Sequence, residues 1–130
     1  MIVALSLAVA PMQDLMDFDA LAGSIAKCDR TAVTNTITAS NSRHSQFLLD
    51  AYKEQYAIAV ARADLAERRR RLHAKEAKVD TEDGLTLLGE ALDDRARALG
   101  DRRALDQSEQ DMLGYFRAQY LRQCSVKMAG

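Results

Sequence analysis

The stretch 41–79 constrains the fold most, because it contains neither glycine nor proline. It is rich in Ala, Leu, Arg, Glu, Lys and Gln, the residues with the highest helix propensities. A single helix over this stretch would be about 55 Å long. Most helical stability in proteins comes from the packing of an apolar face, so a helix of this length needs a partner along its whole length. We therefore expect the rest of the chain to supply that partner.

The composition favours a single all-α domain. The chain has 130 residues, one proline (Pro11) and no runs in which apolar and polar residues alternate between turns, so a sheet is not expected. Its 18 basic and 19 acidic residues give a net charge of −1, which excludes a general attraction to nucleic acid or anionic lipid. No apolar run approaches the roughly 18 residues that a transmembrane helix needs.

The first ten residues, MIVALSLAVA, are purely apolar and resemble the hydrophobic region of a secretory signal peptide. Ala8-Val9-Ala10 matches an A-x-A cleavage site, although no basic residue precedes the run and Pro11 follows it. A short buried segment of the mature fold is the alternative. The signal reading predicts a periplasmic or secreted protein, and the alternative predicts a cytoplasmic one.

Three helical segments are expected within the domain 11–130. A short helix over about 17–28 begins at Asp17, a suitable N-cap, and has Phe18, Leu21, Ile25 and Cys28 on one face. Residues 29–41 are rich in Thr, Asn and Ser, which predicts a connector. The long helix spans about 42–79 and ends at the turn sequence DTEDG.

The last helix is expected over about 82–124. Gly100 lies within it, and Asp106 followed by Glu109 has the pattern of an internal capping box. A break near 100–107 is therefore the alternative to one near-continuous helix. We expect the continuous form, because no proline forces the helix to stop.

The two long segments are expected to form an antiparallel, coiled-coil-like helical hairpin, with the short N-terminal helix packed at its base. Folding at the DTEDG turn pairs residues whose numbers add up to about 164, with alternating steps of three and four as in a heptad seam. Leu65 then faces Leu99, Leu72 faces Leu92, and Arg62 lies near Asp101. All seven aromatic residues are expected at the base, leaving a thinner two-helix arm beyond it.

A second apolar stripe runs along the long helix, and the short helix is expected to cover only its lower part. We call it the outer stripe. It predicts an interaction surface for a protein partner, or a homodimer through the long helix, and it consists of Leu49, Tyr52, Tyr56, Ala59, Ala63 and Ala66.

The two cysteines, Cys28 and Cys124, are both expected at the foot of the hairpin. A structural disulfide between them fits an exported protein, and the alternatives are two free thiols or a metal or redox pair. His44 is expected near the same foot and is the only other candidate ligand there. His44 and His73 would lie about 43 Å apart on one helix, so they cannot share a metal ion. We predict no metal site and no cofactor.

The run Arg68 to Arg71 draws attention as a candidate nucleic-acid patch. Four consecutive helical residues point to different sides, however, and Asp64 and Glu67 stand four positions before Arg68 and Arg71, where ion pairs form. An ion-paired arm is the expected reading, and nucleic-acid binding is disfavoured. Acidic residues also gather around the turn, namely Asp80, Glu82 and Asp83. Their position is explained by the helix that follows, because carboxylates are stabilising near a helix N-terminus.

The segment 105–110, LDQSEQ, resembles in part the Leu-Thr-x-x-Gln motif of the Spy/CpxP-like periplasmic helical chaperones. Asp106 stands in place of the Thr, and Gln110 is one position late. The cysteine pair does not belong to that pattern. No function is carried over from this resemblance.

The sequence therefore predicts a small exported helical protein that acts by binding, as an interaction module, adaptor or chaperone-like protein. A periplasmic metal or redox sensor using Cys28, Cys124 and His44 is one alternative, and an intracellular helical adaptor with weak nucleic-acid contact is another. Catalytic residues, a small-molecule substrate and enzymatic activity are not expected, because a two-helix arm offers no enclosed pocket.

Overall fold

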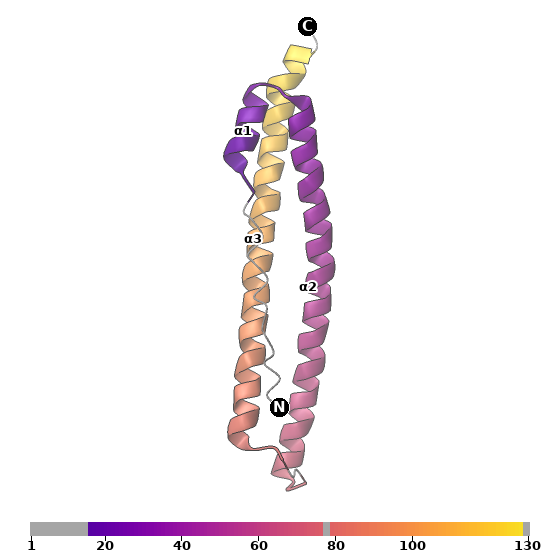
Figure 1. The fold of residues 1–130 in the computed structure, drawn as a ribbon, viewed down its shortest axis with the longest axis vertical. Coiled ribbons are helices and arrows are strands. Elements are labelled where there is room, and N and C mark those ends of the chain that lie inside the picture. Colours follow the sequence, from indigo (N-terminus) through magenta and orange to yellow (C-terminus); the bar gives the residue numbers. More distant parts are fainter. Residues whose placement is uncertain (1–15, 77–78, 129–130) are drawn as a thin grey trace, which may run out of the picture.

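The computed structural model describes residues 16–76 and 79–128, which form three helices: α1 (Phe18–Ala26), α2 (Arg30–His73) and α3 (Glu82–Met128). The two long helices α2 and α3 pack antiparallel as a hairpin, and α1 packs on both of them at its base (Figure 1). The all-α hairpin predicted from the sequence is thus confirmed. The candidate signal peptide, residues 1–10, lies outside the described residues.

Helix α1 begins and ends at polar caps. The Asp17 carboxylate accepts a hydrogen bond from the Ala20 N–H at 2.9 Å, and Leu21 and Ile25 form the buried face. At the C-terminal end the Asp29 N–H donates to the Ser24 carbonyl, and Cys28 adopts a positive φ of 49°, a conformation that glycine usually supplies at this position. The chain therefore reverses sharply and α1 folds back along the hairpin.

Helix α2 begins at Arg30, so the predicted connector 29–41 is wrong. Asp29 caps the helix by accepting a hydrogen bond from the Ala32 N–H at 3.1 Å. The Thr36 hydroxyl donates a hydrogen bond to the Ala32 carbonyl at 2.8 Å, so this hydroxyl has a partner inside the helix. Val33 is buried against α1, and this tertiary packing overrides the weak helix propensity of the Thr- and Ser-rich segment.

The same helix ends at His73, earlier than the predicted boundary near Val79. The Glu76 N–H donates to the Arg71 carbonyl and Lys75 has a φ of 60°, a second left-handed helix end. Arg68 then holds the connector by a two-point ion pair to Asp80, with N–O distances of 2.6 and 3.0 Å.

Helix α3 runs without a break from Glu82 to Met128, which confirms the continuous reading through 100–107. The Thr81 hydroxyl caps its first turn by accepting from the Gly84 N–H at 3.1 Å. Asp106 and Glu109 do not form a capping box, because both side chains reach across to α2.

The predicted alignment of the two long helices is wrong. Leu65 packs with Leu92 and Leu85, and Ile58 packs with Leu99. The cross-helix pairs Arg62–Asp93, Leu65–Gly89 and Arg43–Glu109 have numbers that add up to 155, 154 and 152, about ten less than the predicted 164. The earlier end of α2 moves the middle of the turn toward the N-terminus, which accounts for the shift. Arg62 accordingly pairs with Asp93 at 3.1 Å, and not with Asp101.

The core consists of three clusters along the hairpin. The base cluster joins Leu21, Ile25, Val33 and Leu113, with the rings of Phe18 and Phe116 stacked at 5.6 Å. Two clusters farther along the arm are built by α2 and α3 alone. The expected three-helix base is confirmed, but the expected gathering of all aromatics there is wrong. Phe47 belongs to the second cluster, and three tyrosines are exposed, namely Tyr52, Tyr56 and Tyr115.

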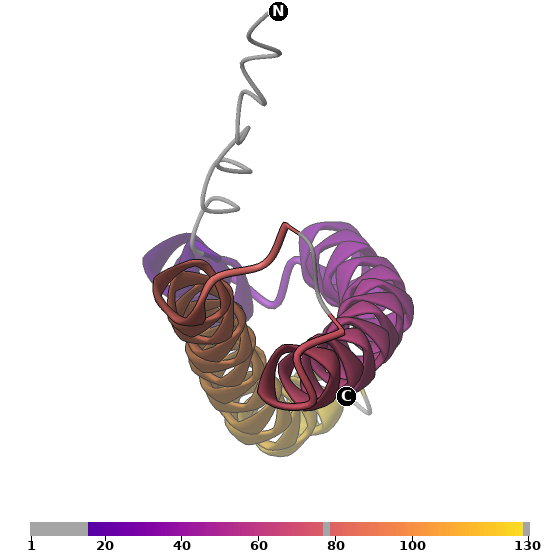
Figure 2. The ribbon, with the colours of Figure 1, turned by 90° about the horizontal axis from the view of Figure 1, so that it is seen from below.

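Among the described residues, no helix is long and apolar enough to cross a membrane. Seen from below, α2 and α3 cross each other instead of running straight side by side (Figure 2). Such winding keeps a heptad seam in contact over a long distance.

Candidate functional site

The outer stripe lies on the side of α2 that points away from α3. The buried seam of α2 passes through Phe47, Ala51, Ile58 and Leu65, and the stripe residues fall about half a helical turn away from it. Tyr52 is 68% exposed, Tyr56 is 65% exposed and Leu49 is 48% exposed. The three alanines of the stripe are exposed as well.

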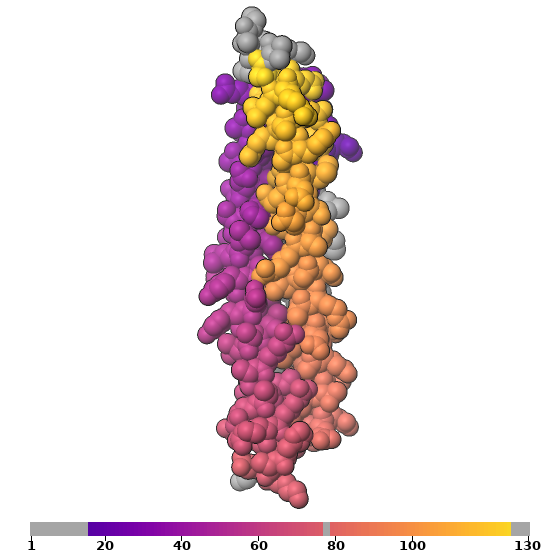
Figure 3. Space-filling view, turned by 180° about the vertical axis from the view of Figure 1, so that it is seen from behind, coloured from indigo at the N-terminus to yellow at the C-terminus, as the bar shows by residue number. Residues whose placement is uncertain are grey.

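The expectation that the short helix covers the lower part of the stripe is wrong. Helix α1 packs against Val33 and Ile37 near the start of α2, and against Leu113, Phe116 and Tyr120 of α3. Because α2 begins at Arg30, its first turns carry α1, and the stripe starts well beyond them. When the molecule is viewed from behind, α2 and α3 make up nearly all of the described surface (Figure 3).

Charged residues border the outer stripe on one flank. Lys53 and Glu67 lie there on either side of Val60, which is 51% exposed. Glu67 accepts hydrogen bonds from Arg70 and Arg71, and the bond from Arg70 is the main reason that the pKa of its carboxyl is lowered to about 2. Glu67 is therefore ionised at every physiological pH.

The structure places Cys28 and Cys124 at disulfide-bonding distance, with their Cα atoms 5.5 Å apart. Cys124 is fully buried, and Cys28 follows the end of α1. The pair joins the short helix to the far end of α3, at the foot of the hairpin where the sequence predicted that the two would meet.

His44 does not lie beside the cysteines. It stands 14 positions after the first residue of α2, about 20 Å along the helix axis. Its Nδ1 atom is 2.7 Å from an oxygen of Asp106. Within residues 16–76 and 79–128, no three potential metal-ligating side chains of His, Cys, Asp or Glu gather at one point. The geometry therefore does not favour the Cys28–Cys124–His44 sensor.

A polar layer separates the base cluster from the second core cluster, and the sequence reasoning missed it. We define it as the consecutive seam residues Ser40 and His44 of α2 and Asp106 and Gln110 of α3. Ser40 is fully buried, and its hydroxyl has no hydrogen-bond partner among the described residues, nor has the buried amide nitrogen of Gln110. The signal was present in the sequence, because Asp106 interrupts a heptad series of leucines formed by Leu85, Leu92, Leu99 and Leu113.

Three of the four residues of the arginine run pair with acidic neighbours. Arg68 pairs with Asp80 and Asp64, and Arg70 and Arg71 pair with Glu67. The two pairs predicted at a spacing of four residues are thus both present. The pKa of Arg68 is raised, chiefly by its hydrogen bond to Asp80. Paired guanidinium groups offer little free positive charge for a phosphate backbone.

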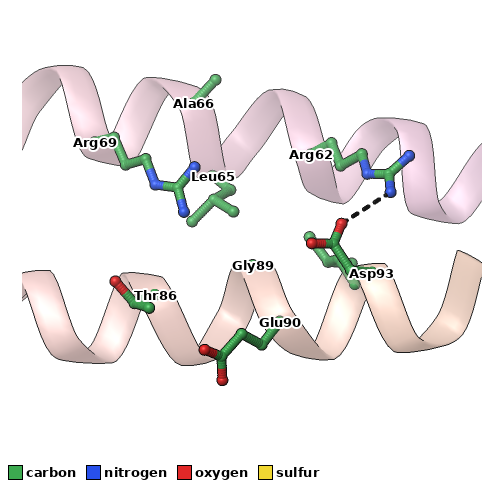
Figure 4. A pocket seen from close by; sticks show the side chains of 9 residues that line it. Arg62, Leu65, Ala66, Arg69, Thr86, Gly89, Glu90 and Asp93 are labelled. Carbon is green, nitrogen blue, oxygen red and sulfur yellow. Dashed lines mark hydrogen bonds and ion pairs between the residues drawn. The ribbon is translucent and has the colours of Figure 1, made fainter.

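Between α2 and α3 lies an open surface pocket of about 340 Å³ near the turn (Figure 4). Arg62 and Asp93 pair at one end of it, and Arg69 extends over Gly89 (Figure 4). A Cβ atom at Gly89 would lie 2.9 Å from the Arg69 guanidinium, so the glycine makes room for that side chain. The pocket is open to solvent and is lined by charges of both signs.

Comparisons of the chain with protein-family models, with curated proteins and with solved structures find no match.

Proposed function

We propose that this protein is an exported protein-interaction module, of adaptor or chaperone-like kind, that binds another polypeptide through the outer stripe. One observation carries the proposal: Leu49, Tyr52 and Tyr56 are 48%, 68% and 65% exposed on a helix face that the described part of the chain leaves uncovered. Tyrosines contribute strongly at protein interfaces, because they combine a large apolar body with a hydrogen-bonding tip.

Export is supported by the cysteine pair. Disulfides persist in oxidising compartments such as the periplasm and are rare in the cytosol. Cys28 and Cys124 at bonding distance therefore favour a periplasmic or secreted location. The apolar run at residues 1–10 fits the same proposal.

The test is site-specific photo-crosslinking in the cells that make the protein. Tyr56 is replaced by the photoreactive p-benzoylphenylalanine, and Leu105 on α3, which is 51% exposed, receives the same group as a matched control. We expect discrete protein adducts from position 56 and none of these adducts from position 105. The additional substitution Tyr52→Ser should suppress the adducts from position 56. Equal adducts from both positions, or none from position 56, would contradict the proposal.

A further inference from the structure

The spacing of the outer stripe reads the same in both directions. From Leu49 to Ala66 its six members follow steps of three, four, three, four and three residues. A second copy of the helix laid antiparallel therefore presents a stripe residue opposite each stripe residue. Alternating steps of this kind are the seam of a coiled coil. The stripe is thus geometrically suited to pair with itself.

The sizes of the side chains favour the same arrangement. The first three members of the stripe are large, namely Leu49, Tyr52 and Tyr56, and the last three are alanines. Antiparallel pairing sets Leu49 opposite Ala66, Tyr52 opposite Ala63 and Tyr56 opposite Ala59 of the second copy. Every layer then holds one large and one small residue, so the spacing between the helices stays even and the interface can be close-packed.

A parallel pairing would lose this fit. It would set each tyrosine against the same tyrosine and each alanine against the same alanine. The tyrosine end would then be crowded and the alanine end would contain voids, both of which are unfavourable in a packed interface.

Flanking charges also fit the antiparallel pair. In the antiparallel pair, Glu67 of the second copy lies about five residues, or roughly 7.5 Å, along the axis from Lys53, within reach of two long side chains. Arg62 then faces the neutral Gln55 of the second copy. Among the described residues Lys53 has no ion-pair partner within its own chain.

We infer that the polypeptide bound by the outer stripe is a second copy of this chain, and that the two α2 helices pack antiparallel with the two-fold axis between residues 57 and 58. This inference rests on the proposed function and names the partner. Beyond the α1 helices, the resulting dimer is a four-helix arrangement in which the two α2 helices form the centre and each α3 lies outside.

The test uses purified protein with p-benzoylphenylalanine at position 52, and a second variant with it at position 49. After irradiation and trypsin digestion, the antiparallel dimer predicts that both variants link to the peptide 63–68 of the second copy. This peptide lies between the cleavage sites after Arg62 and Arg68 and contains both Ala63 and Ala66. Ala63→Glu is expected to reduce the yield at least tenfold, whereas Leu105→Glu on α3 leaves it unchanged.

Two results would overturn the inference. Links to the peptide 44–53, which contains Leu49 and Tyr52, would show a parallel pair. The absence of a covalent dimer at every protein concentration would exclude self-pairing. In that second case, adducts from position 56 to a different protein inside the cell would still support the proposed function, so the two failures are distinguishable.

Discussion

At the scale of single residues, the polar layer is the most informative feature of the seam. His44 and Asp106 are only 31% and 14% exposed, and they lie between two apolar clusters of the core. Partly buried polar groups of this kind are costly unless they are paired. In the pairing predicted from the sequence, Asp106 would have faced Ile58, whereas in the structure it faces His44. The polar layer therefore favours the observed alignment over the predicted one.

Replacing His44 with leucine should leave Asp106 facing an apolar side chain. We expect the free energy of unfolding to fall by about 1–3 kcal/mol, the cost of a buried polar group without its partner. The double variant His44→Leu/Asp106→Leu removes both groups and should recover most of that loss. Urea denaturation followed by circular dichroism measures both effects. A double variant no more stable than His44→Leu alone would refute the pairing argument.

The ion pair at the turn should make stability depend on pH. The hydrogen bond from Arg68 is the largest cause of the lowered pKa of Asp80. A carboxyl whose pKa is lowered by folding stabilises the fold above its ordinary pKa of 3.8, and this contribution is lost as the pH falls through the lowered value. Asp80→Asn should therefore be less stable than the wild type at pH 7, and the difference should shrink below about pH 4. A difference in unfolding free energy that is equal at pH 7 and pH 2 would contradict this prediction.

At the scale of the elements, the sequence predicted the helices better than their ends and their alignment. The apolar period of α2 and α3 was sufficient to predict the hairpin. A heptad pattern, however, repeats itself after seven residues, so Leu65 pairs equally well with Leu92 or Leu99 on apolarity alone. The end of α2 at His73 depends on a left-handed Lys75, which no glycine in the sequence marks. The predicted turn was therefore displaced, and the alignment with it.

The candidate site could be predicted only in part, because the start of one helix was misplaced. Periodicity identified the outer stripe, and the structure leaves its members exposed on α2. The start of α2 was missed because Thr and Asn suggest a connector, although Val33 and Ile37 continue the apolar seam. With that start misplaced, His44 was expected beside the cysteines and α1 was expected over the stripe. Both errors follow from one boundary.

The cysteine pair should fasten α1 to the hairpin. Cys28 and Cys124 are separated by 96 residues, and the entropy model assigns such a loop about 4–5 kcal/mol of stabilisation. Cys28→Ser/Cys124→Ser, or the reduced wild type, should lose stability of this order in urea denaturation. A thiol assay on unfolded, non-reduced wild type should find no free thiol from these two residues. Two free thiols, or equal stability of both forms, would exclude a structural disulfide.

At the scale of the whole molecule, the described part of the chain leaves one apolar face of the hairpin uncovered. The seam between α2 and α3 buries Ile58, Leu65, Leu92 and Leu99, and α1 completes the core only at the base. The outer stripe takes no part in this packing. Exposed apolar surface that is aligned along one helix marks an interaction site. The two-copy arrangement would bury it without any change in the fold.

Sedimentation equilibrium of the purified protein tests this account most directly. The chain has a mass of 14.4 kDa, and the wild type is expected to sediment at twice the mass of one chain. Tyr52→Ser/Tyr56→Ser removes four aromatic side chains from the dimer and should weaken association by roughly 100-fold or more, since aromatic residues dominate interface energies. The control Leu105→Ser/Met112→Ser, which changes two exposed apolar residues of α3, should remain dimeric. A wild type that stays at the mass of one chain at every concentration, or a stripe variant that dimerises as well as the control, would contradict it.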